Sequence, residues 1–192
     1  GLKMRPPTWD LCFFTQISQP FSCHEVAFFT RHTKVNVMIF MGHDVEEVTA
    51  YETTSENEIF QKYEYATTTA SILKFKNGSV GKVASVIDCL QPYYFHTHLV
   101  GSEGSLLDNK LYSTKFGLRD KKWADLPMAM ADSGDVADHP YADQFQAFFN
   151  ALDEGKDMPR TSIGEALETF RVLFACDLSA REGRPVKLSE ID

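Results

Sequence analysis

The sequence predicts an α+β fold, in which an open, largely antiparallel (mixed) β-sheet carries helices on one face and leaves the other face available for oligomerisation. Three observations predict it. Two runs rich in Val, Ile, Thr and Ala flank Asn77-Gly78 within residues 65–89, which is typical of a β-hairpin. Further strand patterns surround this hairpin, and two amphipathic helical patterns follow Asp138. Strands followed by helices favour the α+β class.

Composition is that of an ordinary globular domain. The 192 residues are enough to bury a real core, and we expect one domain over 1–192, with a poorly defined N-terminal segment at 1–23. A net charge of −8 argues against nucleic-acid and membrane partners, since both favour a basic surface. No apolar run is long enough to span a membrane, and no signal peptide is visible.

The cysteines indicate a reducing compartment. Four of them are scattered without a CxxC pair or a zinc-ligand spacing: Cys12, Cys23, Cys89 and Cys176. We therefore expect reduced thiols and a cytoplasmic location. Because the chain starts at Gly1 without an initiator Met, we also expect it to be a fragment of something longer.

The N-terminal third predicts a short strand and a helix. Residues 9–17 have a pattern that suits one short strand. Residues 24–41 are mostly apolar and end at Gly42, which suits a helix C-cap. One stripe at helical spacing joins Phe28, His32, Val35 and Ile39. A helix is favoured, and the β-branched residues of this stretch keep a strand as the alternative.

The middle of the chain predicts consecutive strands. Residues 45–53 alternate as a strand, 55–64 are a polar loop, and 93–100 form a strand after the hairpin. GSEGS at 101–105 is a turn between strands; it does not precede a helix, so it lacks the setting of a phosphate-binding loop. Residues 118–138 have no periodicity and indicate a long surface excursion, either a lid or a connector.

Asn77-Gly78 predicts the register of the hairpin. As a two-residue type I′ loop it pairs Phe75 with Val80, Leu73 with Lys82 and Thr69 with Val86. Ile72, Val83, Thr68 and Ile87 then fall on the opposite face to Leu73 and Thr69. Neither face is strongly polar, so we expect helices to cover one and a second subunit to cover the other.

Two helices are predicted at the end of the chain. The first carries a stripe of large apolar residues and stops at Gly155: Tyr141, Phe145, Phe148, Phe149 and Leu152. The second begins at a Ser162–Glu165 capping box and ends at Gly183. Its predicted buried stripe is Leu167, Phe170, Leu173, Phe174 and Leu178. We expect both stripes to pack on the sheet.

Candidate chemical groups are few. His96 and His98 lie two apart on a predicted strand and share a face, a spacing that suits one metal ion, but nothing nearby supplies a third ligand, so we favour a polar or interfacial role. The acidic residues between Asp125 and Asp138 fit no EF-hand pattern. His32 is the most interesting titratable residue, because on its helix it can exchange protons at neutral pH, and a core histidine is the equal alternative. Asn36, one turn later, is placed to bind the same ligand.

Several segments together resemble the C-terminal domain of the Gfo/Idh/MocA oxidoreductases, the family of glucose-fructose oxidoreductase and inositol dehydrogenase. HTKVNVMIFMG followed by DVEEVTA resembles the family's helix-Gly-strand unit, and ILKFKNGSVGKVASV resembles its central hairpin. LVGSEGSLL is similar to the next strand and turn, and the segment from DHPYADQF to REGRPVKL is similar to its closing helices and terminal strand. The resemblance covers about residues 31–188.

The resemblance implies an NAD- or NADP-dependent enzyme whose N-terminal Rossmann domain holds the cofactor and a catalytic lysine in a Glu-Lys-Pro motif. This chain has neither that domain nor those motifs, so we expect no cofactor in it and no activity from it alone. His32 matches the family's catalytic histidine and Asn36 is a substrate-binding candidate, whereas Phe28 and Val35 occupy positions that are usually acidic. A small-molecule sugar or polyol substrate and a homodimer or homotetramer through the open sheet face are also implied.

Two hypotheses of different class follow. The first is the substrate-binding and oligomerisation domain of an NAD(P)-dependent sugar or polyol oxidoreductase, without its cofactor-binding domain. The second is a non-catalytic dimerisation or ligand-binding module that reuses the fold, which the loss of acid at Phe28 and Val35 favours. An upstream βαβ unit with a glycine-rich turn would discriminate them.

Overall fold

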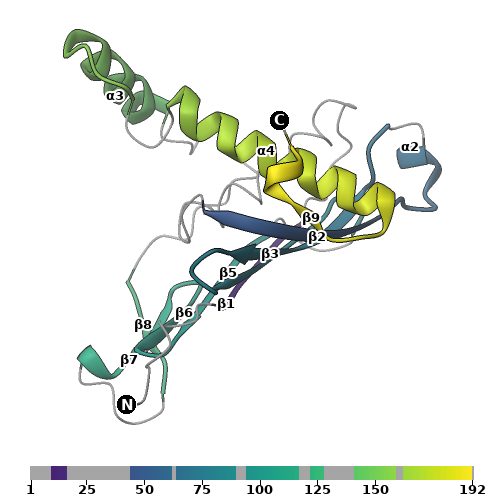
Figure 1. The fold of residues 1–192 in the computed structure, drawn as a ribbon. Coiled ribbons are helices and arrows are strands. Elements are labelled where there is room, and N and C mark those ends of the chain that lie inside the picture. Colours follow the sequence, from purple (N-terminus) through teal and green to yellow (C-terminus); the bar gives the residue numbers. More distant parts are fainter. Residues whose placement is uncertain are drawn as a thin grey trace, which may run out of the picture.

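The computed structural model describes residues 10–16, 44–61, 64–89, 94–116, 122–127, 141–158 and 162–191. In this part of the chain the strands form one nine-stranded sheet with the order β8-β7-β6-β5-β1-β4-β3-β2-β9 (Figure 1). β1 and β4 run parallel, and the other described pairs are antiparallel. The predicted α+β class with an open, largely antiparallel mixed sheet is therefore confirmed.

Most of the predicted strands are present. The strands are β1 (Asp10–Gln16), β2 (Val45–Thr53), β3 (Thr68–Phe75), β4 (Val80–Val86), β5 (Tyr94–Gly101), β6 (Gly104–Leu107), β7 (Lys110–Ser113), β8 (Ala124–Asp125) and β9 (Val186–Lys187). The helices are α2 (Glu58–Gln61), α3 (Tyr141–Asp153) and α4 (Ile163–Glu182), with 3₁₀ turns η1 (Thr114–Phe116) and η3 (Leu188–Glu190). The predicted loop at 55–64 contains α2, and the predicted excursion at 118–138 contains β8. The predicted helix at 24–41 lies outside the described residues.

The hairpin loop is one residue longer than predicted. Phe75 donates its backbone N–H to Ser79 O at 3.0 Å, and Gly78 N donates to Phe75 O at 2.9 Å, so the loop comprises residues 76–78. Gly78 alone in this loop has a positive φ, of 88°, whereas a type I′ turn requires it at Asn77 as well. Asn77 instead accepts a hydrogen bond from Ser79 N at 2.9 Å through its Oδ1.

The longer loop corrects the predicted faces of the hairpin. Leu73 pairs with Gly81 and Ser71 with Val83, so Leu73 and Val83 share the buried face. Lys82 lies on the other face with Ile72, its true partner. A shift of one residue moves every side chain of the partner strand to the opposite face, because side chains alternate with period two.

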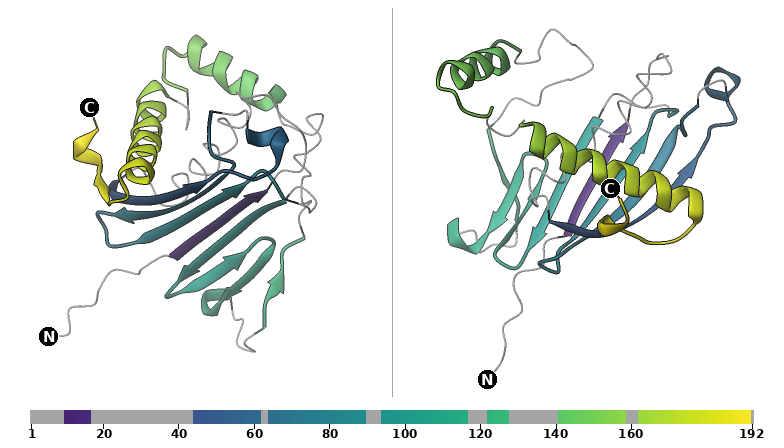
Figure 2. Two further views of the ribbon diagram at one scale, coloured as in Figure 1. Left: turned by 90° about the vertical axis from the view of Figure 1, so that its right-hand side faces the viewer. Right: turned by 45° about the horizontal axis from the view of Figure 1, so that its top comes forward.

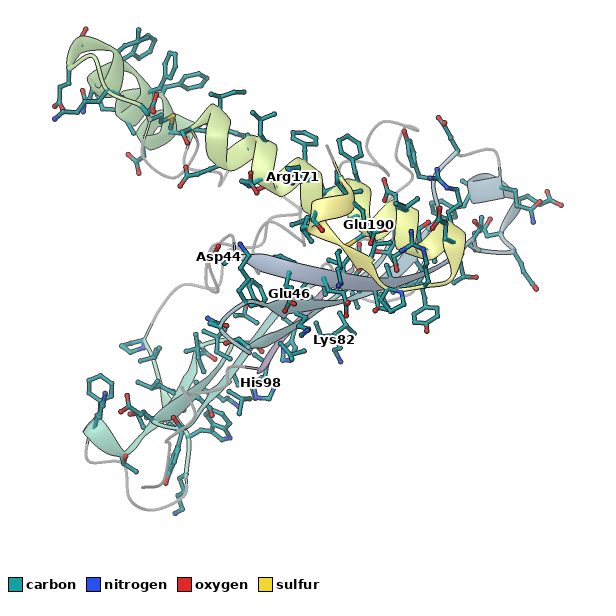
Figure 3. The ribbon with its side chains drawn as sticks, in the orientation of Figure 1. Asp44, Glu46, Lys82, His98, Arg171 and Glu190 are labelled. Carbon is teal, nitrogen blue, oxygen red and sulfur yellow. The ribbon has the colours of Figure 1, made fainter. Side chains whose placement is uncertain are left out.

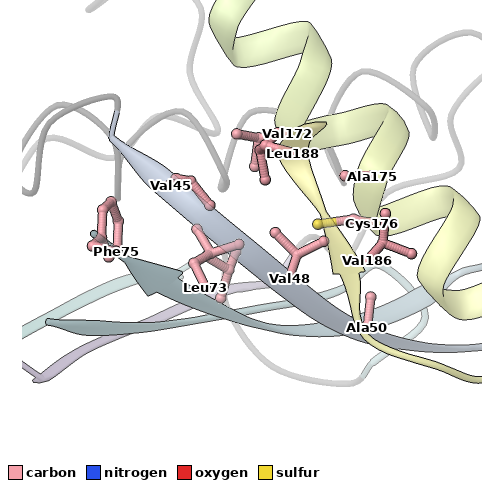
Figure 4. Close-up of a cluster of buried hydrophobic side chains, with 11 residues drawn as sticks. Val45, Val48, Ala50, Leu73, Phe75, Val172, Ala175, Cys176, Val186 and Leu188 are labelled. Atoms are coloured by element: carbon pink, nitrogen blue, oxygen red, sulfur yellow. The ribbon is translucent and has the colours of Figure 1, made fainter. Parts of the chain in front are cut away.

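The buried face of β2 and β3 packs against α4 through a continuous core (Figure 4). Leu73, Phe75 and Val48 are almost fully buried. The remaining members of this core cluster are Val45, Ala50, Val83, Val172, Ala175, Cys176, Val186 and Leu188.

The two last helices depart from the predicted packing. In α4 the side chains that face the sheet are Val172, Leu173, Ala175, Cys176 and Ser179. Leu167, Phe170 and Phe174, which were predicted to be buried, are exposed, and so is the apolar stripe of α3. Figures 1 and 2 show α3 beyond the N-terminal end of α4, away from the sheet. Amphipathic spacing identifies an apolar face but not the surface that covers it.

The ends of α4 form as the sequence predicts. Ser162 Oγ accepts from Glu165 N, and the Glu165 side chain accepts from Ser162 N at 3.1 Å, which completes the capping box. Gly183 ends the helix with a φ of 66°. Beyond it, Arg184 binds Glu182 and Glu190, and the hydrogen bond from Arg184 lowers the pKa of the Glu190 carboxyl.

Ser179 links α4 to the sheet where β9 ends. Its Oγ accepts from Ala50 N at 3.0 Å and donates to Arg184 O at 2.6 Å, and the residue is fully buried. The strand β9 pairs only with Glu47 and Val48, so this hydroxyl takes over the role of a ladder partner for Ala50. The link is a specific hydrogen-bonded joint between helix and strand.

The turn between β5 and β6 confirms the interpretation of GSEGS. Gly101 pairs with Gly104 across the turn. A Cβ at Gly104 would lie 2.7 Å from Tyr112 O, so only glycine permits β7 to approach this closely.

No described helix covers the face of the sheet away from α4 (Figures 1 and 2), which is called the open face below. Lys82 and His98 lie on it, opposite Arg171 and Glu190 on the α4 side (Figure 3). It mixes exposed apolar residues, such as Tyr51 at 71% and Ile72 at 44%, with polar ones. No helix among the described residues is long and apolar enough to cross a membrane.

Candidate functional site

The two predicted site residues, His32 and Asn36, lie outside the described residues, as do Phe28 and Val35. They belong to the connection between β1, which ends at Gln16, and β2, which begins at Val45. The pairings through β4 and β3 make β1 and β2 parallel. The described residues therefore give the two strands that this connection joins, and the geometry of the predicted site stays a prediction.

A row of buried hydroxyl groups lies on the α4 side of the sheet. Thr69, Ser71 and Ser85 are at most 5% exposed, and Thr69 lies directly opposite Ser85. Their hydroxyl oxygens have no hydrogen-bond partner among the described residues. A buried polar group without a partner costs about 1–3 kcal/mol, so such groups usually mark a bound water or ligand.

The three hydroxyl groups can bind water or a ligand through hydrogen bonds, but they cannot act as an acid or a base. Each hydroxyl offers one donor and two acceptor sites, which suits water or the hydroxyl groups of a ligand. None of them titrates near neutral pH, so a proton acceptor has to come from elsewhere. Sequence reasoning missed this row, although Thr69 and Ser71 alternate with Leu73 on one face and thereby signal a polar patch within the core.

Two serine variants distinguish an unpaired hydroxyl from a paired one. We expect Ser179→Ala to lower the free energy of unfolding by about 2 kcal/mol, because Ala50 N and Arg184 O lose their partner. We expect Ser71→Ala to leave it unchanged or raise it by up to about 1 kcal/mol, because no hydrogen bond is lost. Urea unfolding followed by circular dichroism measures both. An equal loss in the two variants would show that the Ser71 hydroxyl has a partner.

A polar cluster at the ends of β2 and β4 is satisfied within the chain. Ser55 Oγ donates to Asp88 Oδ2, and Ser55 N donates to Thr67 Oγ1 at 2.8 Å. Ile87 N donates to Thr67 O at 3.0 Å. This cluster fastens the start of β3 to its neighbours and is structural.

The histidine pair lies on the open face. The rings of His96 and His98 are 6.2 Å apart, and His96 Nδ1 lies 3.0 Å from Asp108 Oδ1. Asp108 also accepts from Thr97 N at 2.9 Å and has a φ of 53°, in the left-handed region. In the described ranges no three His, Cys, Asp or Glu side chains gather into a metal site. His96 is therefore held by its bond to Asp108, and a metal-binding role for the histidine pair has no support in the described residues.

A match to a family model identifies the family of this chain. The model for the C-terminal alpha/beta domain of the Gfo/Idh/MocA oxidoreductase family matches residues 32–188. The chain belongs to this family. The resemblance proposed from the hairpin and the closing helices is confirmed over nearly the same range.

Solved structures of several dehydrogenases share the fold. A probable dehydrogenase from Thermotoga maritima is 20% identical with a TM-score of 0.73, and the match covers 97% of this chain and 57% of that one. A levoglucosan dehydrogenase solved with NADH is 14% identical with a TM-score of 0.72, over 93% and 58%. A myo-inositol dehydrogenase from Corynebacterium glutamicum ATCC 13032 is 17% identical with a TM-score of 0.68, over 93% and 56%.

This Gfo/Idh/MocA chain corresponds to only part of each solved dehydrogenase. It spans between half and two thirds of their length. A search of curated proteins returned no match. At identities of 20% and below, the solved structures establish the fold alone.

Proposed function

We propose that this chain is the substrate-binding and oligomerisation domain of an NAD(P)-dependent oxidoreductase that acts on a CH–OH group of a sugar or polyol. The match to the family's C-terminal domain supports this proposal most strongly. Solved proteins of the same fold include inositol and levoglucosan dehydrogenases, the latter solved with NADH. Inositol and levoglucosan are both polyhydroxylated, and NADH is a nicotinamide cofactor.

The described residues do not fit a nicotinamide dinucleotide. A dinucleotide site uses a glycine-rich turn that follows a strand and opens a helix, so that the helix N-terminus faces the pyrophosphate. The glycine-rich turn here joins the antiparallel strands β5 and β6 instead. We therefore assign cofactor binding to another domain of the intact protein. We propose that this chain supplies the walls of the substrate pocket.

His32 is the proposed proton-transfer group of this domain. A histidine beside a substrate hydroxyl can accept its proton as the alcohol is oxidised. Asn36 is proposed to hold a neighbouring hydroxyl, and the buried hydroxyls of Thr69, Ser71 and Ser85 offer further groups of the chemistry that a polyol requires. Phe28 and Val35 supply no carboxylate to orient the imidazole.

The proposal predicts that this chain alone binds no nicotinamide cofactor. Titration calorimetry of the 192-residue chain with NADH or NADPH should show no binding heat. The intact protein, meaning this chain with its nucleotide-binding domain, should bind one of the two cofactors. Tight binding of either cofactor to this chain alone would contradict the division of labour proposed here.

A non-catalytic module remains the alternative, and the residues at 28 and 35 are the observation that favours it. A phenyl ring and an isopropyl group replace the carboxylates that would orient the histidine. A panel of sugars and polyols, assayed with the intact protein and NAD or NADP, discriminates between the two. Reduction of the cofactor by any member favours the enzyme, whereas substrate binding without reduction favours the module.

Self-association through the open face is the second half of the proposal. Tyr51, Ile72, Val80 and Val100 leave large apolar side chains exposed there. A sheet with one uncovered, partly apolar face is suited to pack against a copy of itself. We propose a homodimer or homotetramer formed through this face.

A further inference from the structure

The open face carries its charged residues in rows that cross the sheet. Strand pairing places one residue of each strand in such a row, because paired residues lie directly opposite each other. We call the row through the middle of the face the central row. From β2 to β7 it consists of Thr49, Ile72, Lys82, Cys12, His98, Leu107 and Lys110. β1 is the fifth of the nine strands, so His98, on the neighbouring β5, lies near the middle of the open face (Figure 3).

His98 lies between two lysines in the central row. Lys82 is two strands away on one side, and Lys110 is two strands away on the other. Neighbouring strands are ~4.8 Å apart, so the backbone of each lysine is about 10 Å from that of His98. Val80 and Val100, in the next row, are exposed apolar residues. The row therefore places positive charge within the partly apolar surface that we propose for self-association.

The two histidines of the open face differ in their ionic contacts. His96 Nδ1 lies 3.0 Å from Asp108 Oδ1, so a protonated His96 forms an ion pair within its own chain. His98 forms no ion pair with a carboxylate of the described residues, although its ring lies 6.2 Å from that of His96. Protonation of His98 therefore adds a positive charge that the described residues do not compensate by direct contact.

Further titratable residues lie on the strands on either side of His98. In β1, Cys12 pairs with His98 and Asp10 pairs with Val100. β6 has the sequence GSLL and contributes none, and β7 contributes Tyr112 besides its lysine. Even with Asp10 counted against the two lysines of the central row, protonation of His98 increases a positive excess.

Two-fold symmetry amplifies the effect of this charge. In a dimer formed through one face, both copies contribute the same surface, so residues near its middle approach their own copies. Face-to-face sheets pack about 10 Å apart. Protonated His98 would therefore bring like charges together in an interface from which screening water and salt are largely excluded. A neutral imidazole avoids this repulsion and still forms hydrogen bonds.

We propose that His98 makes the self-association of this chain sensitive to pH, an inference that rests on the self-association proposed above. The oligomer forms when the imidazole is neutral and dissociates when it is protonated. Histidine is the side chain whose charge ordinarily changes between about pH 5 and 8, so the response falls in that range. Because the separated chains bind the proton more readily than the oligomer, association is strong above this range and is lost as the pH falls.

Sedimentation velocity at two pH values tests the proposal. The 192-residue chain is measured over a range of concentrations, with circular dichroism at each pH to monitor folding. We expect the dissociation constant of a dimer to rise on the order of 100-fold from about pH 7.5 to about pH 5.5, roughly tenfold for each copy of His98. Dissociation accompanied by loss of the folded spectrum would show unfolding instead and contradict the proposal.

The net charge of the chain predicts the opposite trend, which makes the test selective. The net charge is −8 at pH 7, and the isoelectric point is about 5.2. Acidification towards the isoelectric point removes the overall repulsion between copies and should strengthen association. Weaker association at the lower pH therefore requires a local positive charge.

Three variants assign the response to one histidine. His98→Gln should associate equally at both pH values, because its side chain stays neutral. His98→Lys should associate weakly at both, because its side chain stays charged. His96→Gln is the matched control on the same strand and face, and it should retain the pH dependence because the histidine that it removes is paired with Asp108.

The remaining outcomes separate the proposal from the self-association on which it rests. Equal association of the wild type at both pH values would overturn the role of His98 and leave self-association standing. A wild type that is monomeric at both pH values would overturn both. A pH dependence that survives in His98→Gln, or that is lost in His96→Gln, would assign the response to another group and contradict the proposal.

Discussion

Val83→Asp is expected to prevent the chain from folding. Val83 is 1% exposed and belongs to the core cluster with Leu73 and Phe75. A carboxylate there loses its hydration and gains no partner, which costs at least ~4 kcal/mol. Domains are stable by about 5–15 kcal/mol in total, so most or all of the stability is lost. Far-ultraviolet circular dichroism and urea unfolding measure the effect.

The matched control for this variant is Val83→Ala. It creates a small cavity without a buried charge, and we expect it to fold with a loss of about 1–3 kcal/mol. If Val83→Asp unfolds at the same urea concentration as the wild type, the assignment of Val83 to the covered face is wrong.

Val86→Asp is expected to break self-association while the monomer stays folded. Val86 lies three residues from Val83 along β4, an odd spacing that places it on the open face, and it is only partly buried. In a symmetric dimer each copy contributes one carboxylate to the interface. An unpaired interfacial charge costs about 3 kcal/mol, or roughly a 100-fold weaker dimer. Sedimentation velocity over a range of concentrations measures the change.

Ile72→Asp, a second variant on the same face, tests the same interface independently. Both should retain the wild-type circular dichroism spectrum and sediment as monomers. A folded Val86→Asp variant that keeps the sedimentation coefficient of an associated wild type would exclude the open face as the interface. A wild type that is monomeric at all concentrations would exclude the interface outright.

The central hairpin was predictable from the sequence except for its register. Asn77-Gly78 and the flanking β-branched residues predict the hairpin, and Gly78 adopts the positive φ that the prediction requires. The hydrogen bond from Phe75 N to Ser79 O, however, closes a longer loop. Asn77-Gly78 suits both loops, and the choice between them depends on which side of β4 faces α4, a tertiary property.

The closing helices show what periodicity does and does not predict. Their bounds and caps follow from Ser162, Gly155 and Gly183. Their apolar stripes were predicted to face the sheet. Leu173 of the α4 stripe is buried and Leu178 packs against the core, whereas Leu167, Phe170 and Phe174 are exposed. The rest of the sheet-facing side is made of the smaller residues Val172, Ala175 and Cys176. Small side chains allow α4 to approach β2 closely, while the large rings face outward.

The candidate site was predictable only as far as its family. His32 was predicted from its helical stripe and from the resemblance, and Asn36 from its place one turn later; the family match confirms the resemblance for the chain as a whole. Their contacts lie outside the described residues and stay predictions. The unpaired hydroxyls of Ser71 and Ser85 could not be identified from sequence, because a serine on a strand is ordinary until its burial is known.

The position of β1 has a consequence for how the chain folds. β1 precedes the other described strands in the sequence, yet its two neighbours are β4 and β5, so it cannot complete its pairing until both have emerged. Those neighbours run antiparallel to each other and are close in sequence, so they can pair directly as a hairpin before β1 enters. Insertion of β1 therefore competes with a local structure, and we expect a slow step in refolding. A β1 from another copy fits the same gap, which makes this strand the element most prone to exchange between chains.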